Sequence, residues 1–292
     1  MARIRYLTCD VFTDTPFEGN PLAVFPDAGG LSASAMLCLA QEFGYAETTF
    51  VQPPRDGGFA RVRIFTTLAE VPFAGHPNIG TAAMLALDGR LGGSDEPESL
   101  VFEELAGPVR MQVERIDHRR ARASLVTPHP WRAKAQVPVG VAAACAGLAP
   151  GDIVVDTHQP VMGGVGLTFC FAQVADRQTL ARADYDVGAF RRADRDHPHS
   201  DDAFSLYLYA RQGDRIDARM FAPLAAPPED PATGSAAAGL TALLAGSGCG
   251  DRFTVRQGED MGRPGMIVTA MDGDLVRVEG EAVKMMEGWI DV

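Results

Sequence analysis

Apolar positions recur along the chain with two periods, one typical of helices and one of strands. In LSASAMLCLAQEFG the apolar residues share one face of a helix, with Ser32 as the N-cap and Gly44 as the stop. GHPNIGTAAMLALDG predicts a second helix, with Pro77 in its first turn and Gly89 as its stop, and SAAAGLTALLAG predicts a third. Short apolar runs bounded by turn residues predict strands at YLTCDVF, PLAVF, ETTFV, ARVRIF, VRMQVE, RASLV, TFCFAQV, SLYLYAR, DARMF, GMIVTA and LVRVEG.

A repeat links the first and second halves of this pattern. The segment Arg63–Ala69 (RIFTTLA) matches Arg219–Ala225 (RMFAPLA) at an offset of 156 residues, 219 minus 63. Two glycines then open a small-residue helix in each half at an offset of 159: Gly75 with Gly80, and Gly234 with Gly239. The same order of strand, loop, glycines and helix predicts two pseudo-equivalent α+β halves.

The junction between the halves and the main difference between them can both be located. Three prolines interrupt the pattern at VTPHPWRAKAQVP, which predicts a first half at residues 1–127 and a second at 128–292. The offsets differ by three, 159 minus 156, so the second half carries three extra residues before its helix, which we place around Pro228–Asp230. Asp230 therefore corresponds roughly to Val71 in the first half.

Composition narrows the class of protein. With 292 residues, 46% of them hydrophobic and 22% charged, the chain is typical of a globular protein. A net charge of -12 disfavours nucleic acid or an anionic membrane as the partner, because both need local basic density. The five cysteines are scattered, no apolar run is long enough to span a bilayer, and the start lacks a signal-peptide pattern. These features predict a cytoplasmic protein.

The two glycine-opened helix starts are candidate anion sites. A helix N-terminus offers unpaired N–H groups and a partial positive charge, which can hold a carboxylate, and glycine lets a ligand approach the backbone. A single loop of this kind is more simply a tight turn. Two matching loops in a duplicated chain favour a site for a small carboxylate substrate in a cleft between the halves.

Three ionisable residues near these helix starts could move protons. Glu47 heads a predicted strand, where position alone favours a solvated edge residue over a partly buried general acid/base. His76 is either a histidine of a surface turn or a proton relay. Asp230 is either a cap or turn former or a second acid.

Other chemistries are disfavoured. The chain has no G-x-x-x-x-G-K-[ST] motif, and GGVGLTF lacks the third glycine of a dinucleotide site, so we predict no nucleotide cofactor. The polar segment from Asp194 to Asp202, which includes His197, is more typical of a solvated loop than of a metal site, and we predict no metal. Ser235 has no His or Asp partners fixed by local sequence for a hydrolase triad.

Four motifs in order resemble those of the phenazine-biosynthesis PhzF-like family: DVFTDTPFEGNPLAVF, YAETTFV, FAGHPNIGTA and EDPATGSAAAGL. The resemblance continues to VRVEGEAVKMMEGWI and so covers essentially the whole chain. It implies the diaminopimelate-epimerase-like fold, an α+β fold of two pseudo-twofold-related halves, each a mixed β-sheet wrapped around a central α-helix, with the active site between them. In this fold the last strand, about residues 283–292, packs back on the first half of the same chain. The resemblance also implies a homodimer.

The resemblance implies roles for individual residues. Glu47 in ETTF resembles the family's proton-shuttling acid/base, with His76 and Asp230 as supporting polar residues. The substrate-binding positions implied are Gly75, Pro77, Thr233, Gly234 and Ser235. In the related epimerases a cysteine occupies each helix start, where this chain has Ala74 and Thr233, so two-thiol racemisation is disfavoured. The family often has a serine before the glutamate, where this chain has Ala46.

Three hypotheses stay open at this point. The first is a cofactor-independent isomerase that moves a proton within a small carboxylic acid, similar to trans-2,3-dihydro-3-hydroxyanthranilate isomerase. The second is an epimerase or racemase with Glu47 and Asp230 as its two bases. The third is a non-catalytic binder of small acids, which a Glu47 side chain pointing into solvent, far from Asp230 and His76, would favour.

Overall fold

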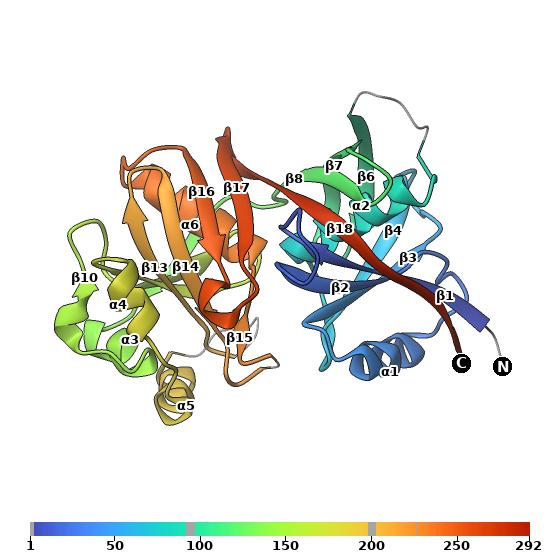
Figure 1. The fold of residues 1–292 in the computed structure, drawn as a ribbon. Helices are drawn as coiled ribbons and strands as arrows, with labels where there is room; N and C mark the ends of the chain where they lie inside the picture. Colours follow the sequence, from blue (N-terminus) through green and yellow to red (C-terminus); the bar gives the residue numbers. More distant parts are fainter. Residues whose placement is uncertain (1–2, 92–96, 198–202, 226) are drawn as a thin grey trace. The chain divides into compact units, whose positions relative to one another are not determined.

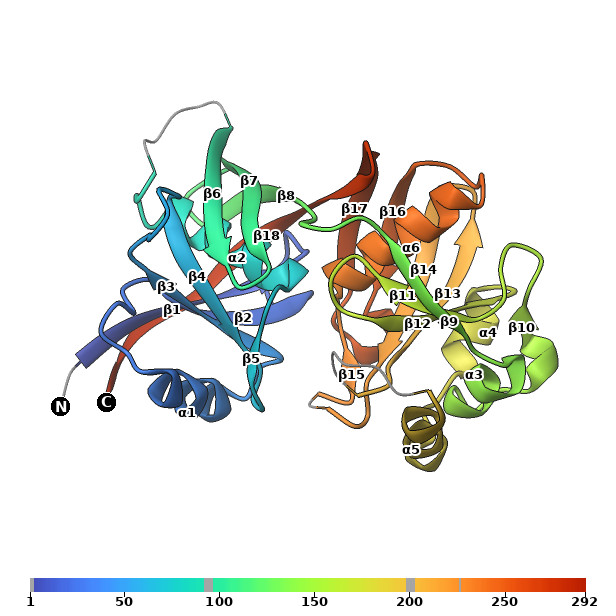
Figure 2. The same cartoon turned by 180° about the vertical axis from the view of Figure 1, so that it is seen from behind.

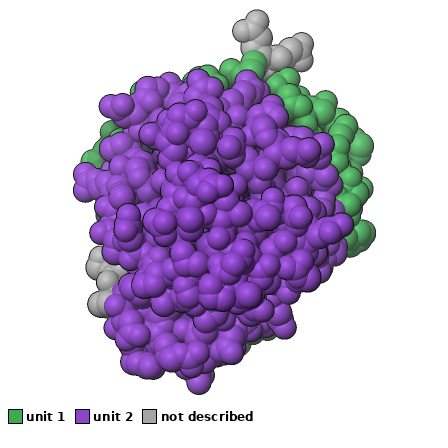
Figure 3. Space-filling model, turned by 90° about the vertical axis from the view of Figure 1, so that its left-hand side faces the viewer, with its two compact units in different colours: residues 1–128, 278–292 green, residues 129–277 purple. Residues whose placement is uncertain are grey.

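The computed structural model describes residues 3–91, 97–197, 203–225 and 227–292, which divide into two compact units. Unit 1 comprises residues 1–128 and 278–292, and unit 2 comprises residues 129–277 (Figure 3). Each unit is a mixed β-sheet with few helices, and each is described by itself.

Unit 1 alternates strands with two helices (Figure 1). Its elements are β1 (Arg3–Val11), β2 (Asn20–Phe25), α1 (Ala33–Phe43), β3 (Glu47–Gln52), β4 (Ala60–Phe65), β5 (Glu70–Val71), α2 (Gly75–Leu87), β6 (Glu98–Glu104), β7 (Gly107–Arg115) and β8 (Arg120–Val126). The long strand β18 (Leu275–Asp291) enters this unit and pairs antiparallel with β1, from Val11 opposite Ala282 to Arg3 opposite Asp291.

Unit 2 contains the remaining elements (Figure 2). They are β9 (Arg132–Gln136), α3 (Val139–Cys145), a 3-10 turn (Pro150–Asp152), β10 (Ile153–Val154), β11 (Val161–Gly164), β12 (Phe169–Val174), α4 (Arg177–Arg182), α5 (Val187–Asp196), β13 (Leu206–Gln212), β14 (Arg215–Phe221), β15 (Glu229–Asp230), α6 (Gly234–Gly246), β16 (Arg252–Gln257), a second 3-10 turn (Glu259–Met261) and β17 (Gly265–Asp272).

The strand pairings of the two units follow the same order. In unit 1, β2 runs parallel to β3, β3 antiparallel to β4, and β4 parallel to β6. In unit 2, β12 runs parallel to β13, β13 antiparallel to β14, and β14 parallel to β16.

Two helices lie against the strands of the two units. Helix α2 contacts β1, β2, β3, β7 and β8, and α6 contacts β11, β16 and β17.

Both helices are buried on every side along most of their length. Every residue of α2 from Gly75 to Leu85 is buried, as is almost every residue of α6 from Gly234 to Leu244. Because a helix with this environment has no solvent face, its sequence consists of small and apolar residues rather than an amphipathic stripe. The amphipathic helix α1 instead packs one face on Phe25, Phe50 and Phe65 of unit 1.

The repeated segments make the same contacts in the two units. Arg63 is paired with Glu70 and its guanidinium lies 5.1 Å from the ring centroid of Phe65. Arg219 is paired with Glu229, with N–O distances of 2.8 and 2.9 Å, and its guanidinium lies 4.7 Å from the ring of Phe221. The recurring R-[IM]-F pattern therefore encodes one ion pair and one cation–π contact in each unit.

The register of β5 and β15 corrects the expected position of the three extra residues. Phe65 pairs with Glu70 and Ile64 with Val71, while Phe221 pairs with Glu229 and Met220 with Asp230. Glu229 and Asp230 therefore take the places of Glu70 and Val71, and the extra residues lie before Glu229, in the loop after Phe221. The correspondence of Asp230 with Val71 is confirmed, whereas the placement of the extra residues around Pro228–Asp230 was wrong, because Glu229 and Asp230 belong to β15.

The second glycine of each pair is explained by close packing rather than by a turn. A Cβ at Gly80 would lie 2.5 Å from Cδ2 of Leu22 and 2.7 Å from Cγ2 of Val11. A Cβ at Gly239 would lie 2.9 Å from Cζ of Phe171. These side chains are fully buried and cannot move aside, so only glycine lets α2 and α6 approach their sheets this closely.

All three predicted helices are confirmed, including the caps of the first. Ser32 accepts a hydrogen bond from the N–H of Ala35, and Gly44 ends α1 in a left-handed conformation. The sequence pattern missed the strands β5, β6, β9, β10, β11, β15 and β16 and the helices α3, α4 and α5. Strand β6 was missed because acids occupy both its ends, and α5 because its polar face gives it the composition of a loop.

Candidate active site

Three polar side chains from separate elements of unit 1 meet at the start of α2. Glu47 is the first residue of β3, Asn20 the first residue of β2, and His76 the second residue of α2. Oε2 of Glu47 lies 3.4 Å from Nε2 of His76, and Nδ2 of Asn20 lies 3.2 Å from Nδ1 of His76. The side chains of Glu47 and His76 are only 17% and 4% exposed. The positional interpretations, a solvated edge residue and a surface turn histidine, were therefore wrong.

The histidine of this cluster is neutral. Burial lowers the pKa of His76 to about 3, because the imidazolium would lose its hydration. Glu47 and His76 therefore do not form an ion pair: the carboxylate lies beside an uncharged imidazole. Since the amide of Asn20 donates to Nδ1, the ring proton is assigned to Nε2, which faces Glu47. His76 can therefore donate one hydrogen bond on the side of the carboxylate.

The start of α2 is not capped by a side chain. Its N-cap residue is Ala74, which makes no side-chain hydrogen bond to the first turn. The side chain of Asn78 bonds backward, from Nδ2 to the carbonyl oxygen of Ala74 at 3.0 Å. A helix start without a side-chain cap keeps N–H groups for an anion, with Gly75 and Pro77 buried beside His76.

The start of α6 in unit 2 also lacks a side-chain cap, and a hydrogen-bond network holds its N-cap residue, Thr233. Oγ1 of Thr233 donates to Oδ2 of Asp230 at 2.5 Å, and the N–H of Thr233 donates to Oε1 of Gln257. Nε2 of Gln257 donates to Thr233 Oγ1 and to the carbonyl oxygen of Asp230, while the hydroxyl of Tyr207 donates to Oε1. Asp230 is thus part of the structure that orders this helix start, beside the buried Gly234 and Ser235.

Sequence reasoning missed Asn20 and Gln257 as members of these sites. Asn20 lies within the quoted motif DVFTDTPFEGNPLAVF, but a single asparagine after glycine reads as a turn residue. Gln257 ends a strand that the pattern did not predict. Both residues lie far in the sequence from the residues that they contact, so a local sequence pattern cannot identify them as site residues.

Metal binding finds no support in the part of the chain that the structure describes. Within those residues no group of three or more His, Cys, Asp and Glu side chains is arranged to hold an ion. In the polar segment after Asp194, residues 194–196 end α5 and His197 follows as its C-cap, whereas residues 198–202 lie outside the described residues.

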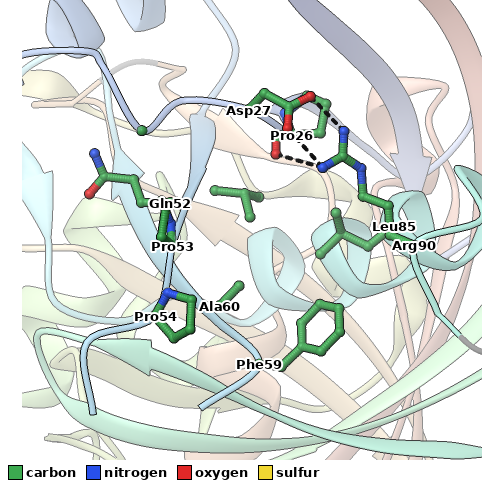
Figure 4. Close-up of a pocket in the computed structure, with 11 residues that line it drawn as sticks. Pro26, Asp27, Gln52, Pro53, Pro54, Phe59, Ala60, Leu85 and Arg90 are labelled. Atoms are coloured by element: carbon green, nitrogen blue, oxygen red, sulfur yellow. Dashed lines mark hydrogen bonds and ion pairs between the residues drawn. The ribbon is translucent and has the colours of Figure 1, made fainter. Parts of the chain in front are cut away.

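Unit 1 also has a pocket of about 530 Å³ (Figure 4), whose lining includes neither Glu47 nor His76. Its lining is largely apolar and includes Pro53, Pro54 and Phe59. Its charged residues neutralise each other, because Arg90 makes paired hydrogen bonds to Asp27 and a further contact to the carbonyl oxygen of Pro26. A pocket whose arginine is already paired lacks the free positive charge that a carboxylate substrate needs.

Comparison with known proteins settles the family. The family model described as "Phenazine biosynthesis-like protein" matches residues 9–288. The chain belongs to this family. An uncharacterized isomerase of Mesorhizobium japonicum is 37% identical over 302 residues, covering 97% of each chain. A trans-2,3-dihydro-3-hydroxyanthranilate isomerase of Pseudomonas chlororaphis is 33% identical, covering 98% of this chain and 99% of that protein. The predicted membership of an isomerase family is confirmed.

Solved structures of the family and of more distant proteins share the fold. A predicted epimerase from Pseudomonas aeruginosa superposes with a TM-score of 0.82 at 28% identity, covering 98% of this chain and 99% of its own. A hydroxyproline epimerase from Agrobacterium vitis superposes with a TM-score of 0.66 at 14% identity, covering 99% of this chain and 91% of its own. The epimerase-like fold that the family resemblance implied is confirmed at this level.

Proposed function

We propose that this phenazine biosynthesis-like protein is an isomerase that moves a proton within a small carboxylic acid, with Glu47 as the group that carries the proton. The observation that supports it most is the position of Glu47, half-enclosed and 3.4 Å from Nε2 of a neutral histidine at an uncapped helix start. A carboxylate there can accept a proton from substrate carbon, while nearby N–H groups stabilise the anion that forms.

The proposed steps conserve every proton. The carboxylate of Glu47 removes a proton from one carbon of the substrate, and the electron pair of the broken C–H bond delocalises into the substrate. The N–H groups of Gly75 and His76 at the start of α2 would bind the substrate carboxylate, aided by the helix dipole. The protonated Glu47 then returns the proton to a different carbon, which shifts the double bond and regenerates the carboxylate. This exchange needs no cofactor.

We propose the same pseudo-twofold arrangement of halves that the family resemblance implied, each with α2 or α6 as its central helix. Matching strand pairings and the matching Arg–Glu–Phe contacts support it. By the same registers, Ser205 takes the place of Glu47, since Thr48 and Leu206 pair with Phe65 and Phe221. Glu47 and Asp230 therefore do not occupy equivalent positions in the two halves.

A two-base epimerase is the second candidate, because the superposed structures include epimerases. The inequivalent positions of Glu47 and Asp230 favour the isomerase, in which only one group must carry a proton. The catalytic role of Asp230 stays a prediction. Product stereochemistry distinguishes the two: a shifted double bond supports the isomerase, and inversion at one carbon supports the epimerase.

Glu47→Gln tests the proposal. The variant removes the base while keeping the shape of the side chain. With trans-2,3-dihydro-3-hydroxyanthranilate, the compound named for the Pseudomonas relatives, we expect solvent deuterium incorporation in heavy water to fall by about 10²–10⁴-fold. Glu103→Gln, on the opposite face of β6 from α2, is the matched control and should exchange like the wild type. Undiminished exchange in Glu47→Gln would rule out Glu47 as the proton carrier.

We also propose a cytoplasmic homodimer that binds a small carboxylate. The five cysteines are free thiols, which fits a reducing compartment, and the described residues include no helix that could cross a membrane. The homodimer rests on the family resemblance alone. Sedimentation equilibrium tests it directly, with a monomer mass as the outcome against it.

A further inference from the structure

Glu104 ends β6 with its carboxyl group buried. Both carboxyl oxygens are shielded from solvent, and neither meets a donor among the described residues in good hydrogen-bond geometry. The polar side chain beside them is Asn78, whose Oδ1 has no partner either. Burial raises the pKa of Glu104 well above its usual range, and the Asn78 amide offsets this only in part. The steps proposed above give this group no task.

The orientation of Glu104 follows from the alternation of side chains along β6. Leu100 and Phe102 are buried on the same face, toward α2. Glu103 lies on the opposite face, where its carboxylate accepts hydrogen bonds from the backbone N–H groups of residues 55, 56 and 58. Glu104 therefore points toward the helix, where its neighbour Asn78 lies in the first turns of α2.

Among the described residues, no charged group acts on Glu104 as a counter-charge. The adjacent strands place apolar side chains on this face: Ala60 and Val62 from β4, and Val109 and Met111 from β7. Arg61 and Arg63 of β4 and Arg110 of β7 alternate to the opposite face, and Arg115 lies at the exposed far end of β7. At the start of α2 the titratable groups on this face are His76 and, from β3, Glu47, which face each other.

Unit 2 has a defined counterpart of Glu104. In β6, Phe102 lies beside Ala60, five residues before Phe65. In β16, Val255 lies beside Ile216, five residues before Phe221. Two residues further on, Glu104 and Gln257 therefore occupy the same place. Gln257 is the residue whose amide holds the N–H and hydroxyl of Thr233 and the carbonyl of Asp230, and so fixes the start of α6.

We propose that Glu104 is a positioning residue that acts through Asn78 to fix the start of α2, as Gln257 fixes the start of α6. A neutral carboxyl group, like an amide, offers one donor and one acceptor. Its O–H can donate to Oδ1 of Asn78, whose Nδ2 already donates to the carbonyl of Ala74. This chain of contacts ends at the residue before Gly75 and His76. The inference rests on the proposed function, because those two residues form the substrate site there.

The protonated form is essential to this role. An ionised Glu104 has no O–H and could not donate to Oδ1 of Asn78, which would stay without a hydrogen-bond donor. Glutamine at this position reproduces the neutral carboxyl in shape and hydrogen bonding, whereas alanine leaves Asn78 without a neighbour. The two substitutions thus separate the hydrogen-bonding role from mere filling of space.

Hydrogen exchange of the backbone amides of residues 74–76, 78 and 79 provides a test that needs no substrate. In Glu104→Ala we expect these amides to exchange at least about tenfold faster than in the wild type, and in Glu104→Gln at the wild-type rate. Asn78→Ala breaks the link from the other side and should resemble Glu104→Ala. Glu103→Gln is the control on the same strand and should leave this segment unchanged.

Kinetics with trans-2,3-dihydro-3-hydroxyanthranilate extend the test to catalysis. We expect kcat/KM to fall at least about tenfold in Glu104→Ala and to recover in Glu104→Gln, since the start of α2 binds the substrate. Unchanged exchange in Glu104→Ala, or equal loss in Glu104→Gln, would overturn the positioning role. If the wild-type protein does not turn over this compound but the variants show the expected hydrogen exchange, the compound is not the substrate and the positioning role of Glu104 is still supported.

Discussion

At the scale of single residues, the site depends on which atoms carry protons. His76 is neutral because it is buried, and its tautomer is set by Asn20, which donates to Nδ1 and leaves the proton on Nε2. Burial raises the pKa of Glu104 and so favours its neutral form, because burial disfavours the charged form of both an acid and a base. Neither protonation state follows from the type of residue. At their ordinary pKa values, a glutamate is charged and a histidine is partly charged near neutral pH.

Asn20→Asp should reverse the tautomer of His76. A carboxylate can only accept, so it would draw the ring proton to Nδ1 and leave Nε2 as an acceptor facing the Glu47 carboxylate. We expect the ¹⁵N resonances of the imidazole to exchange their protonated and unprotonated positions, with activity falling at least about tenfold. Asn20→Ala, which removes the partner without imposing a tautomer, is the control. A wild-type pattern in Asn20→Asp would show that Asn20 does not set the tautomer.

At the scale of elements, two buried helices set the positions of the site residues. Gly80 and Gly239 let α2 and α6 lie directly against buried side chains of their sheets. Since the helix starts are one to two turns away from these glycines, any outward shift of either helix moves His76 or Ser235 with it. The two glycines of each pair therefore have different roles. Gly75 and Gly234 begin the helices, and Gly80 and Gly239 let the helices pack closely on their sheets.

Adding a single methyl group at these glycines should destabilise the fold. We expect Gly80→Ala and Gly239→Ala each to lower the free energy of unfolding by about 1–3 kcal/mol, because the new Cβ overlaps fully buried side chains. Gly246→Ala is the matched control at the exposed end of α6, where a Cβ meets nothing within 4 Å. It should instead stabilise by up to about 1 kcal/mol. Urea denaturation measures all three, and equal effects at Gly239 and Gly246 would contradict the packing argument.

At the scale of the whole molecule, two buried groups should give stability an unusual dependence on pH. The pKa of His76 falls from 6.5 to about 3 on folding, so the unfolded chain binds more protons below pH 6.5 and stability is lost as the pH drops toward 3. The pKa of Glu104 rises from 4.5, so the native state holds a proton that the unfolded chain releases, and stability is lost as the pH rises above 4.5. Between pH 4.5 and 6.5 the two effects oppose each other.

Substitution of Glu104 should remove the loss of stability at higher pH, and substitution of His76 should remove the loss of stability at lower pH. Each contributes a slope of at most about 1.4 kcal/mol per pH unit within its window. We expect Glu104→Gln to flatten the loss above pH 4.5 and to be more stable than the wild type at pH 7, and His76→Asn to flatten the loss on the acid side. Urea denaturation from pH 4 to 9 checks both. A Glu104→Gln profile parallel to that of the wild type would show that Glu104 is ionised in the native state.

The sequence by itself determined the features that are local or repeated. Ser32 and Gly44 predict the ends of α1 because caps act within one turn, and the Arg63 and Arg219 segments predict matching structure because each encodes the same ion pair. The motifs also pointed to Glu47, His76 and Asp230 as candidates. Their position in the chain alone favoured a surface role for Glu47, which the structure contradicts.

Only the tertiary structure decided which residues meet and which are charged. Asn20 reaches His76 across 56 residues, and Gln257 reaches Thr233 across 24, through strand pairings that no local pattern specifies. Glu104 was not a candidate in the sequence, because an acid at a strand end is ordinarily solvated. The rise in its pKa comes from burial on the face of β6 that carries Leu100 and Phe102, and such burial depends on the tertiary structure rather than on the residue itself.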